Sequence, residues 1–207
     1  MRIKRACTAI CMAALLLLAS CRQPPDQDHE TAEPSGDLQK TNVIAPYQFT
    51  DSEEELLRLV CMDDIIQLFN FSVDDDIGSV TFWCEEYEKG QFIYTHLERT
   101  AEIDGGGKIA ITIDDKELNM AVAHGTSYRG SGITYTASDN YSSQSQYSRQ
   151  TEIEPDAEIA LFVYAHAGDD QNEALQLPGF YMEVPDRLGD FDRVYLFKCR
   201  FREESID

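Results

Sequence analysis

The sequence predicts a mainly β protein, an antiparallel β-sandwich with one short N-terminal helix. Two observations support this fold class. Apolar residues alternate with polar ones in several segments after residue 65, as they do along half-buried strands. Asp, Asn, Gly and Pro, the residues that favour turns, separate these segments. About six or seven short strands with at most one helix are typical of two packed antiparallel sheets.

The helix is expected to begin at Thr50. Thr50 followed by Glu53 matches a capping box, in which each side chain accepts a hydrogen bond from the other residue's backbone N–H. Acidic residues crowd the first turn, and apolar residues follow over 56–60. The alternative is a first strand over residues 56–60 that turns at Asp63-Asp64.

The clearest strand pattern is a hairpin between about residues 80 and 97. The apolar face of its first strand consists of Val80, Phe82 and Cys84. The opposite, mixed face consists of Thr81, Trp83 and Glu85. Glu88-Lys89-Gly90 is a turn sequence, and residues 92–97 form the returning strand. A preceding strand over residues 65–73 ends at the turn Asp74-Asp75-Asp76.

Four further strands have recognisable patterns. Ile109, Ile111 and Ile113 alternate with polar or small residues, and Asp114-Asp115-Lys116 turns this strand into residues 118–122. Residues 159–165 are apolar on both faces, which predicts a central strand. The last strand alternates over residues 195–202. We expect an immunoglobulin-like topology from the strand count, although the Cys…Trp…Cys spacing of true immunoglobulin domains is absent.

The first residues have the pattern of an export signal. Arg2, Lys4 and Arg5 precede an apolar run over residues 9–18, which is too short for a lasting membrane helix. The run ends in Leu18-Ala19-Ser20-Cys21, which resembles the lipobox of bacterial lipoproteins. The resemblance implies a signal peptide over residues 1–20 and acylation of Cys21, with palmitate among the chains. It further implies anchoring to the outer face of a bacterial membrane, with the bilayer as a partner.

The rest of the chain divides into two parts. Residues 21–45 are rich in Pro, Ser, Gly and acidic residues without apolar periodicity, which predicts a disordered tether. Residues 46–207 then form a single sandwich domain.

Net charge restricts the partners. Removal of the leader takes three of the 17 basic residues and leaves 14 against 38 acidic ones, a net charge of −24. Nucleic acid is excluded as a partner because its binding requires basic residues that replace counterions. An acidic surface could attract cationic partners or divalent ions, but a solvated face that keeps an exported protein soluble is the simpler explanation. The candidate partner is a surface protein or a glycan.

Three cysteines remain after the leader and Cys21, namely Cys61, Cys84 and Cys199. Export permits disulfides. Cys84 and Cys199 both alternate with apolar residues, so a bridge between these two is expected first, with buried free thiols as the alternative. No Cys/His cluster suggests structural zinc.

The most distinctive interior stretch covers residues 125–150. Its tyrosines stand among Ser, Gly and Gln, a composition that antibody paratopes use for recognition; they are Tyr128, Tyr135, Tyr141 and Tyr147. A recognition loop is one interpretation. The other is a polar excursion, partly a hairpin around residues 133–136. Trp83 is a second candidate, as a stacking platform for a sugar.

Acidic clusters at predicted strand ends suggest a calcium site. The candidate ligands are Asp74, Asp76, Asp169 and Asp170. Calcium requires six to eight oxygens brought together, so the site depends on these turns sharing one end of the sandwich. Ordinary turn chemistry is the simpler explanation. No other cofactor is expected.

Catalytic motifs are absent from the sequence. It contains no G-x-S-x-G elbow, H-E-x-x-H helix or P-loop. We therefore expect a lipid-anchored, non-catalytic surface domain that binds a ligand or partner. The alternatives are a small cell-envelope hydrolase with a carboxylate near His96 or His166, and a structural domain stiffened by calcium.

Overall fold

The computed structural model describes residues 41–61, 65–114, 117–134, 142–146, 149–166, 188–189 and 191–203. These residues belong to two compact units. One unit contains the helix α2 (Asp51–Cys61), and the other contains all the strands that the described residues form. The predicted signal peptide and most of the predicted tether, residues 1–40, lie outside the described residues.

Helix α2 begins where the capping box predicted. The Thr50 backbone N–H donates to Glu53 Oε2 at 2.8 Å, and the Glu53 backbone N–H donates to Thr50 Oγ1 at 3.3 Å. Both N–H groups would otherwise lack partners at the first turn. Asp51, Glu53 and Glu54 occupy that turn. The helix is confirmed, and the alternative of a strand over residues 56–60 is wrong.

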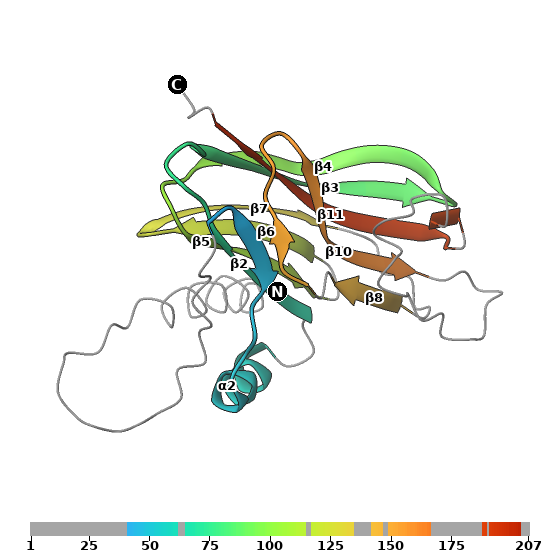
Figure 1. Cartoon of the computed structure of the whole chain (residues 1–207). Coiled ribbons are helices and arrows are strands. Elements are labelled where there is room, and N and C mark those ends of the chain that lie inside the picture. Colours follow the sequence, from blue (N-terminus) through green and yellow to red (C-terminus); the bar gives the residue numbers. More distant parts are fainter. Residues whose placement is uncertain are drawn as a thin grey trace. The chain divides into compact units, whose positions relative to one another are not determined.

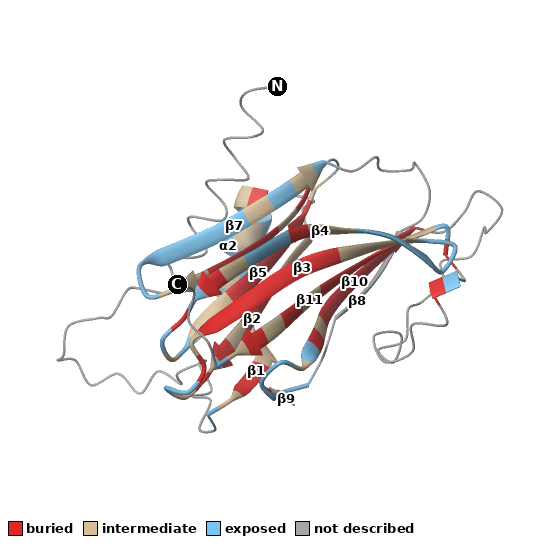
Figure 2. Cartoon of the chain, turned by 90° about the horizontal axis from the view of Figure 1, so that it is seen from above, coloured by how far each residue is buried: buried red, intermediate tan, exposed pale blue. Residues whose placement is uncertain are grey.

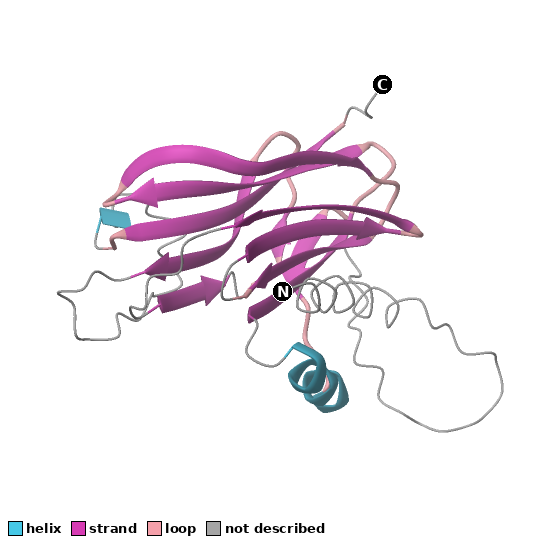
Figure 3. Cartoon of the chain, turned by 180° about the vertical axis from the view of Figure 1, so that it is seen from behind, coloured by secondary structure: helices cyan, strands magenta, loops and turns pink. Residues whose placement is uncertain are grey.

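The strands form two antiparallel sheets (Figures 1 and 3). Sheet A has the order β7-β6-β5-β2-β1-β9, and sheet B has the order β4-β3-β11-β10-β8. The strands of sheet A are β1 (Val43–Pro46), β2 (Ile65–Ser72), β5 (Gly107–Ile113), β6 (Glu117–His124), β7 (Ser127–Thr134) and β9 (Thr151–Glu152). Those of sheet B are β3 (Ser79–Glu88), β4 (Gln91–Glu102), β8 (Ser142–Gln146), β10 (Glu158–His166) and β11 (Arg193–Arg202).

A shared apolar core joins the two sheets and confirms the sandwich. The core rows are those that alternation predicted, and they include Phe82 and Cys84 on β3 and Phe197 on β11. The rings of Phe71 on β2 and Phe201 on β11 meet edge to face, with centroids 5.3 Å apart. Buried residues fill the first six positions of β3 and recur along β11, whereas β7 is mostly exposed (Figure 2).

The strand order follows the immunoglobulin pattern only in part. In that fold strand B lies between strands A and E, and strand C pairs with F, the last strand but one. Here β2 likewise lies between β1 and β5, but β3 pairs with β11, the last strand of the chain.

Strand β10 is central, as its apolar composition predicted. It lies between β11 and β8, and both of its faces are covered. Phe162 and Tyr164 belong to the main core, whereas Val163 and Ala165 belong to a second cluster with Leu188 and other residues on the outer side of sheet B.

Four short or polar strands were not predicted. Val43 and Ile44 in β1 are buried, so the predicted tether boundary at residue 45 is too late. Within the polar stretch 125–150, β7 and β8 are strands, which corrects the loop interpretation for those residues. Both occupy sheet edges, where backbone pairing needs only one neighbour and no apolar alternation. The fourth is β9, at the other edge of sheet A.

The β3–β4 hairpin is confirmed with a two-residue turn. Lys89 and Gly90 have φ values of 50° and 78°, the left-handed pair that favours the twist of a tight hairpin. A Cβ at Gly90 would lie 2.9 Å from the backbone of Gly189, so close approach also requires glycine here.

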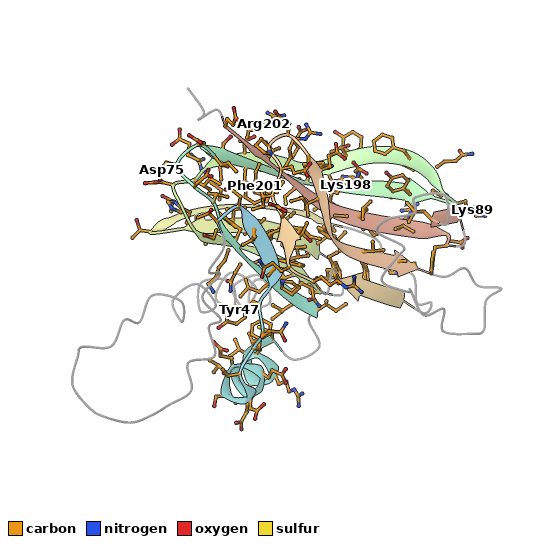
Figure 4. All side chains as sticks on the ribbon, viewed as in Figure 1. Tyr47, Asp75, Lys89, Lys198, Phe201 and Arg202 are labelled. Atoms are coloured by element: carbon orange, nitrogen blue, oxygen red, sulfur yellow. The ribbon has the colours of Figure 1, made fainter. Side chains whose placement is uncertain are left out.

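The sandwich has two ends, which we name the β1 end and the hairpin end. At the β1 end Asn42 Nδ2 donates to Asp74 Oδ2 at 2.6 Å, just before β1 begins. The hairpin end is marked by the Lys89-Gly90 turn. Strand β3 has 10 residues and so separates the two ends by about 30 Å. Asp75 and Lys89 accordingly lie at opposite ends of the sandwich in Figure 4.

Candidate functional site

Sheet B extends beyond the strands of sheet A at the hairpin end (Figures 1 and 3). Along the core-facing side of sheet B, the side chains change there from apolar to polar. On β3, Cys84 is followed on the same face by Glu86, and on β11 Tyr195 is preceded by Arg193. We call this set the overhang row; it comprises Glu86, Tyr94, His96, Tyr164, His166, Arg193 and Tyr195.

Glu86 is the centre of the overhang row. Its Oε2 lies 2.7 Å from His96 Nε2 on β4, and its Oε1 lies 3.2 Å from Arg193 Nη1 on β11. Its side chain is only 13% exposed. Partners from both neighbouring strands thus hold the carboxylate in one orientation, and Arg193 compensates its charge.

The buried side chains of Tyr195 and His166 lie near this ion pair. Burial raises the pKa of Tyr195, and the negative charge of Glu86 raises it further, whereas a hydrogen bond with Arg193 acts in the opposite direction. Burial lowers the pKa of His166, and the positive charge of Arg193 adds to this. His166 is therefore neutral near pH 7. Its ring meets the edge of Tyr164, with centroids 4.8 Å apart.

The tip of the hairpin exposes three consecutive apolar or aromatic residues. Phe92, Ile93 and Tyr94 are 56%, 49% and 60% exposed. Tyr94 contacts His96 on the core-facing side, with centroids 4.8 Å apart, and Phe92 contacts Tyr87 on the outer side at 5.8 Å. Exposed apolar clusters of this kind mark interaction sites more often than isolated exposed residues do.

Trp83 is not available as a stacking platform. Its side chain faces outward as predicted, but the residue is only 7% exposed. The guanidinium of Arg200 lies over the ring, 5.4 Å from its centroid, and Nε1 donates to Glu85 Oε1 at 2.9 Å. The ring is therefore occupied by contacts within the sheet.

Glu85 links side chains of β3 and β11 on the outer face of sheet B. It accepts hydrogen bonds from Trp83, from the Tyr87 hydroxyl at 2.6 Å and from Lys198 Nζ at 3.0 Å. Burial alone would raise the pKa of Glu85, but these bonds hold it below its usual value. This network has the character of a structural ion-pair cluster.

The predicted tyrosines are only partly placed. Tyr128 lies near the start of β7, at the β1 end, and is 47% exposed. It is therefore far from the hairpin. Tyr135, Tyr141 and Tyr147 lie outside the residues whose side chains the structure describes.

The structure describes only two of the four candidate calcium ligands. Asp74 and Asp76 belong to a turn at the β1 end, where the Asp76 backbone N–H donates to Asp74 Oδ1 at 3.3 Å. Asp169 and Asp170 lie outside the described residues and follow β10, which ends at the hairpin end. Among the described residues, no three acidic, His or Cys side chains are grouped as a metal would require.

Cys84 and Cys199 point into the core as predicted, but they are free thiols. Cys84 pairs with Phe197, and Cys199 pairs with Phe82, so the cysteines are diagonal neighbours on adjacent strands. Diagonal neighbours are about 7–8 Å apart, with their Cβ atoms somewhat closer, whereas the Cβ atoms of a disulfide are about 4 Å apart. The predicted Cys84–Cys199 disulfide is therefore wrong, and the alternative of buried free thiols is confirmed.

Sequence reasoning named His96 and His166 beside an unspecified carboxylate, but it missed the other members of the overhang row. One signal was present: Glu86 falls on the same face as Val80, Phe82 and Cys84, so alternation places a carboxylate on the core-facing side. No helix in the described part of the chain is long and apolar enough to cross a membrane. No family model matches the chain, and neither curated proteins nor solved structures give a significant match.

Proposed function

We propose that this chain is an exported, lipid-anchored and non-catalytic domain that binds a surface protein or glycan with the hairpin end of its sandwich. The observation that carries the proposal is the exposed run Phe92-Ile93-Tyr94 at that end. Burying exposed apolar area gives a favourable free energy of association, by about 25 cal/mol per Å² before ordering costs.

The exposed run lies at the opposite end of the sandwich from Asn42, which directly precedes β1. A partner bound at the hairpin end is therefore separated from the start of β1 by the length of β3.

Anchoring and binding are tested on the same protein in cells. Cys21→Ser should move the protein from the membrane fraction to the released fraction. A photo-crosslinking residue at position 92 should form adducts that the unlabelled lipid-free domain competes away. The same residue at Asp75, at the opposite end, is the matched control and should form none. Equal adducts at both positions would contradict the proposal.

One observation favours a second candidate, the small hydrolase. A carboxylate that is hydrogen-bonded to a histidine can orient the histidine as a general base. Glu86 is hydrogen-bonded to His96 in this way. The candidate predicts turnover of a glycan or ester substrate that Glu86→Gln abolishes. Binding without turnover would reject it.

A further inference from the structure

We propose that the overhang row binds a neutral oligosaccharide, through stacking on Tyr94 and hydrogen bonds to Glu86 and Arg193. This inference rests on the proposed function, because it names the ligand class for the same end of the sandwich. It is carried by the combination of an exposed ring, a fixed carboxylate and a partly exposed guanidinium on one face.

Tyr94 supplies an exposed aromatic ring on which a sugar ring can stack. A pyranose ring has a face of C–H bonds and a rim of hydroxyls, and its C–H face stacks on exposed aromatic rings. Tyr94 is 60% exposed, and its edge-to-face contact with His96 limits the orientations of the ring. A ring held in this way loses little conformational entropy when a ligand binds.

Glu86 and Arg193 supply an acceptor and a donor side by side. Each carboxylate oxygen has a lone pair beyond the one that His96 or Arg193 uses, and the guanidinium has five N–H donors. The Arg193 side chain is 39% exposed, so some of its donors reach solvent. Sugar hydroxyls donate and accept at once, which matches a fixed acceptor next to a fixed donor.

The charges at the hairpin end favour a neutral ligand. Arg193 compensates Glu86 at 3.2 Å and approaches Glu88 at 4.0 Å, while Lys89 approaches Asp192 at 3.9 Å. Among the described residues there, no excess of positive charge would attract a phosphate or an acidic glycan. Glu86 is equally unsuited to a cationic ligand, because its charge is already compensated.

The test uses the mature chain with Cys21→Ser, which carries no lipid. Neutral fragments of β-glucan, chitin, xylan and mannan are titrated by calorimetry up to millimolar concentration. We expect one class to bind, and Tyr94→Ala to raise its dissociation constant about tenfold or more. Tyr94→Phe keeps the ring and should retain affinity, as should Tyr128→Ala, which removes an exposed tyrosine at the β1 end.

Two outcomes overturn the inference. One is the absence of binding by every fragment class, and the other is equal affinity for the parent and Tyr94→Ala. Neither removes the proposed function by itself: competed adducts with a protein at position 92 would leave the binding function intact with a protein partner. Loss of those adducts as well would reject both.

Discussion

At the scale of single residues, Glu85 shows how an acidic chain uses a carboxylate for structure. Its side chain is 13% exposed and accepts hydrogen bonds from Trp83, Tyr87 and Lys198. We expect Glu85→Gln to lower the free energy of unfolding at pH 7 by about 1–3 kcal/mol, because bonds to a charged acceptor are lost. Urea denaturation measures this, and Glu88→Gln, with a half-exposed side chain, is the matched control.

The same substitution predicts a pH dependence. Since the folded-state pKa of Glu85 is lowered, its contribution is present above the unfolded value of about 4.3 and is lost as the pH falls through the folded value. The parent and Glu85→Gln should therefore converge in stability at acidic pH. A difference of equal size at pH 3 and pH 7 would show that the ionised form is not responsible.

The buried cysteines give a second prediction at this scale. Burial raises the pKa of both the Cys84 and Cys199 thiols, so little thiolate forms and both should resist alkylation in the folded protein. After unfolding without a reducing agent, mass spectrometry should find both cysteines alkylated. A Cys84–Cys199 peptide pair released only by reduction would contradict the free-thiol structure.

At the scale of elements, the hairpin turn is the most sharply defined. An alanine at Gly90 would combine a left-handed φ with a Cβ 2.9 Å from Gly189, whereas Gly125 has a φ of 53° with open space around it. Both substitutions should cost about 1 kcal/mol from backbone strain, and Gly90→Ala should cost more because of the clash. Thermal unfolding measures the difference. Equal losses would mean that the contact with Gly189 does not constrain the turn.

The elements also show what local sequence can predict. Alternation located β3, β5, β6 and β11 because each has one face in the core, and the Thr50 capping box located α2. The alternation of apolar and polar residues did not reveal β1, which has four residues, or β7 and β8, which are polar edge strands. Pairing stabilises these strands: β7 pairs with β6 directly before it, whereas β1 and β8 pair with strands farther along the chain.

At the scale of the whole sandwich, strand order decides which residues meet. Acidic residues follow both β2 and β10 in the sequence, but only the order of strands shows that β10 ends far from Asp74. Strand order also assembles the overhang row. Glu86 and His96 are near in sequence, whereas Arg193 joins them only because β11 pairs with β3. No periodicity in the sequence encodes that last pairing.

Hydrogen exchange of the lipid-free mature chain, with and without cell-envelope glycan and surface-protein fractions, tests the central claim most directly. Binding at the hairpin end predicts slower exchange in residues 88–96 when the partner fraction is present, with the turn at residues 74–78 unchanged. Slower exchange confined to residues 74–78, or no change at the hairpin with any fraction, would contradict binding at the hairpin end.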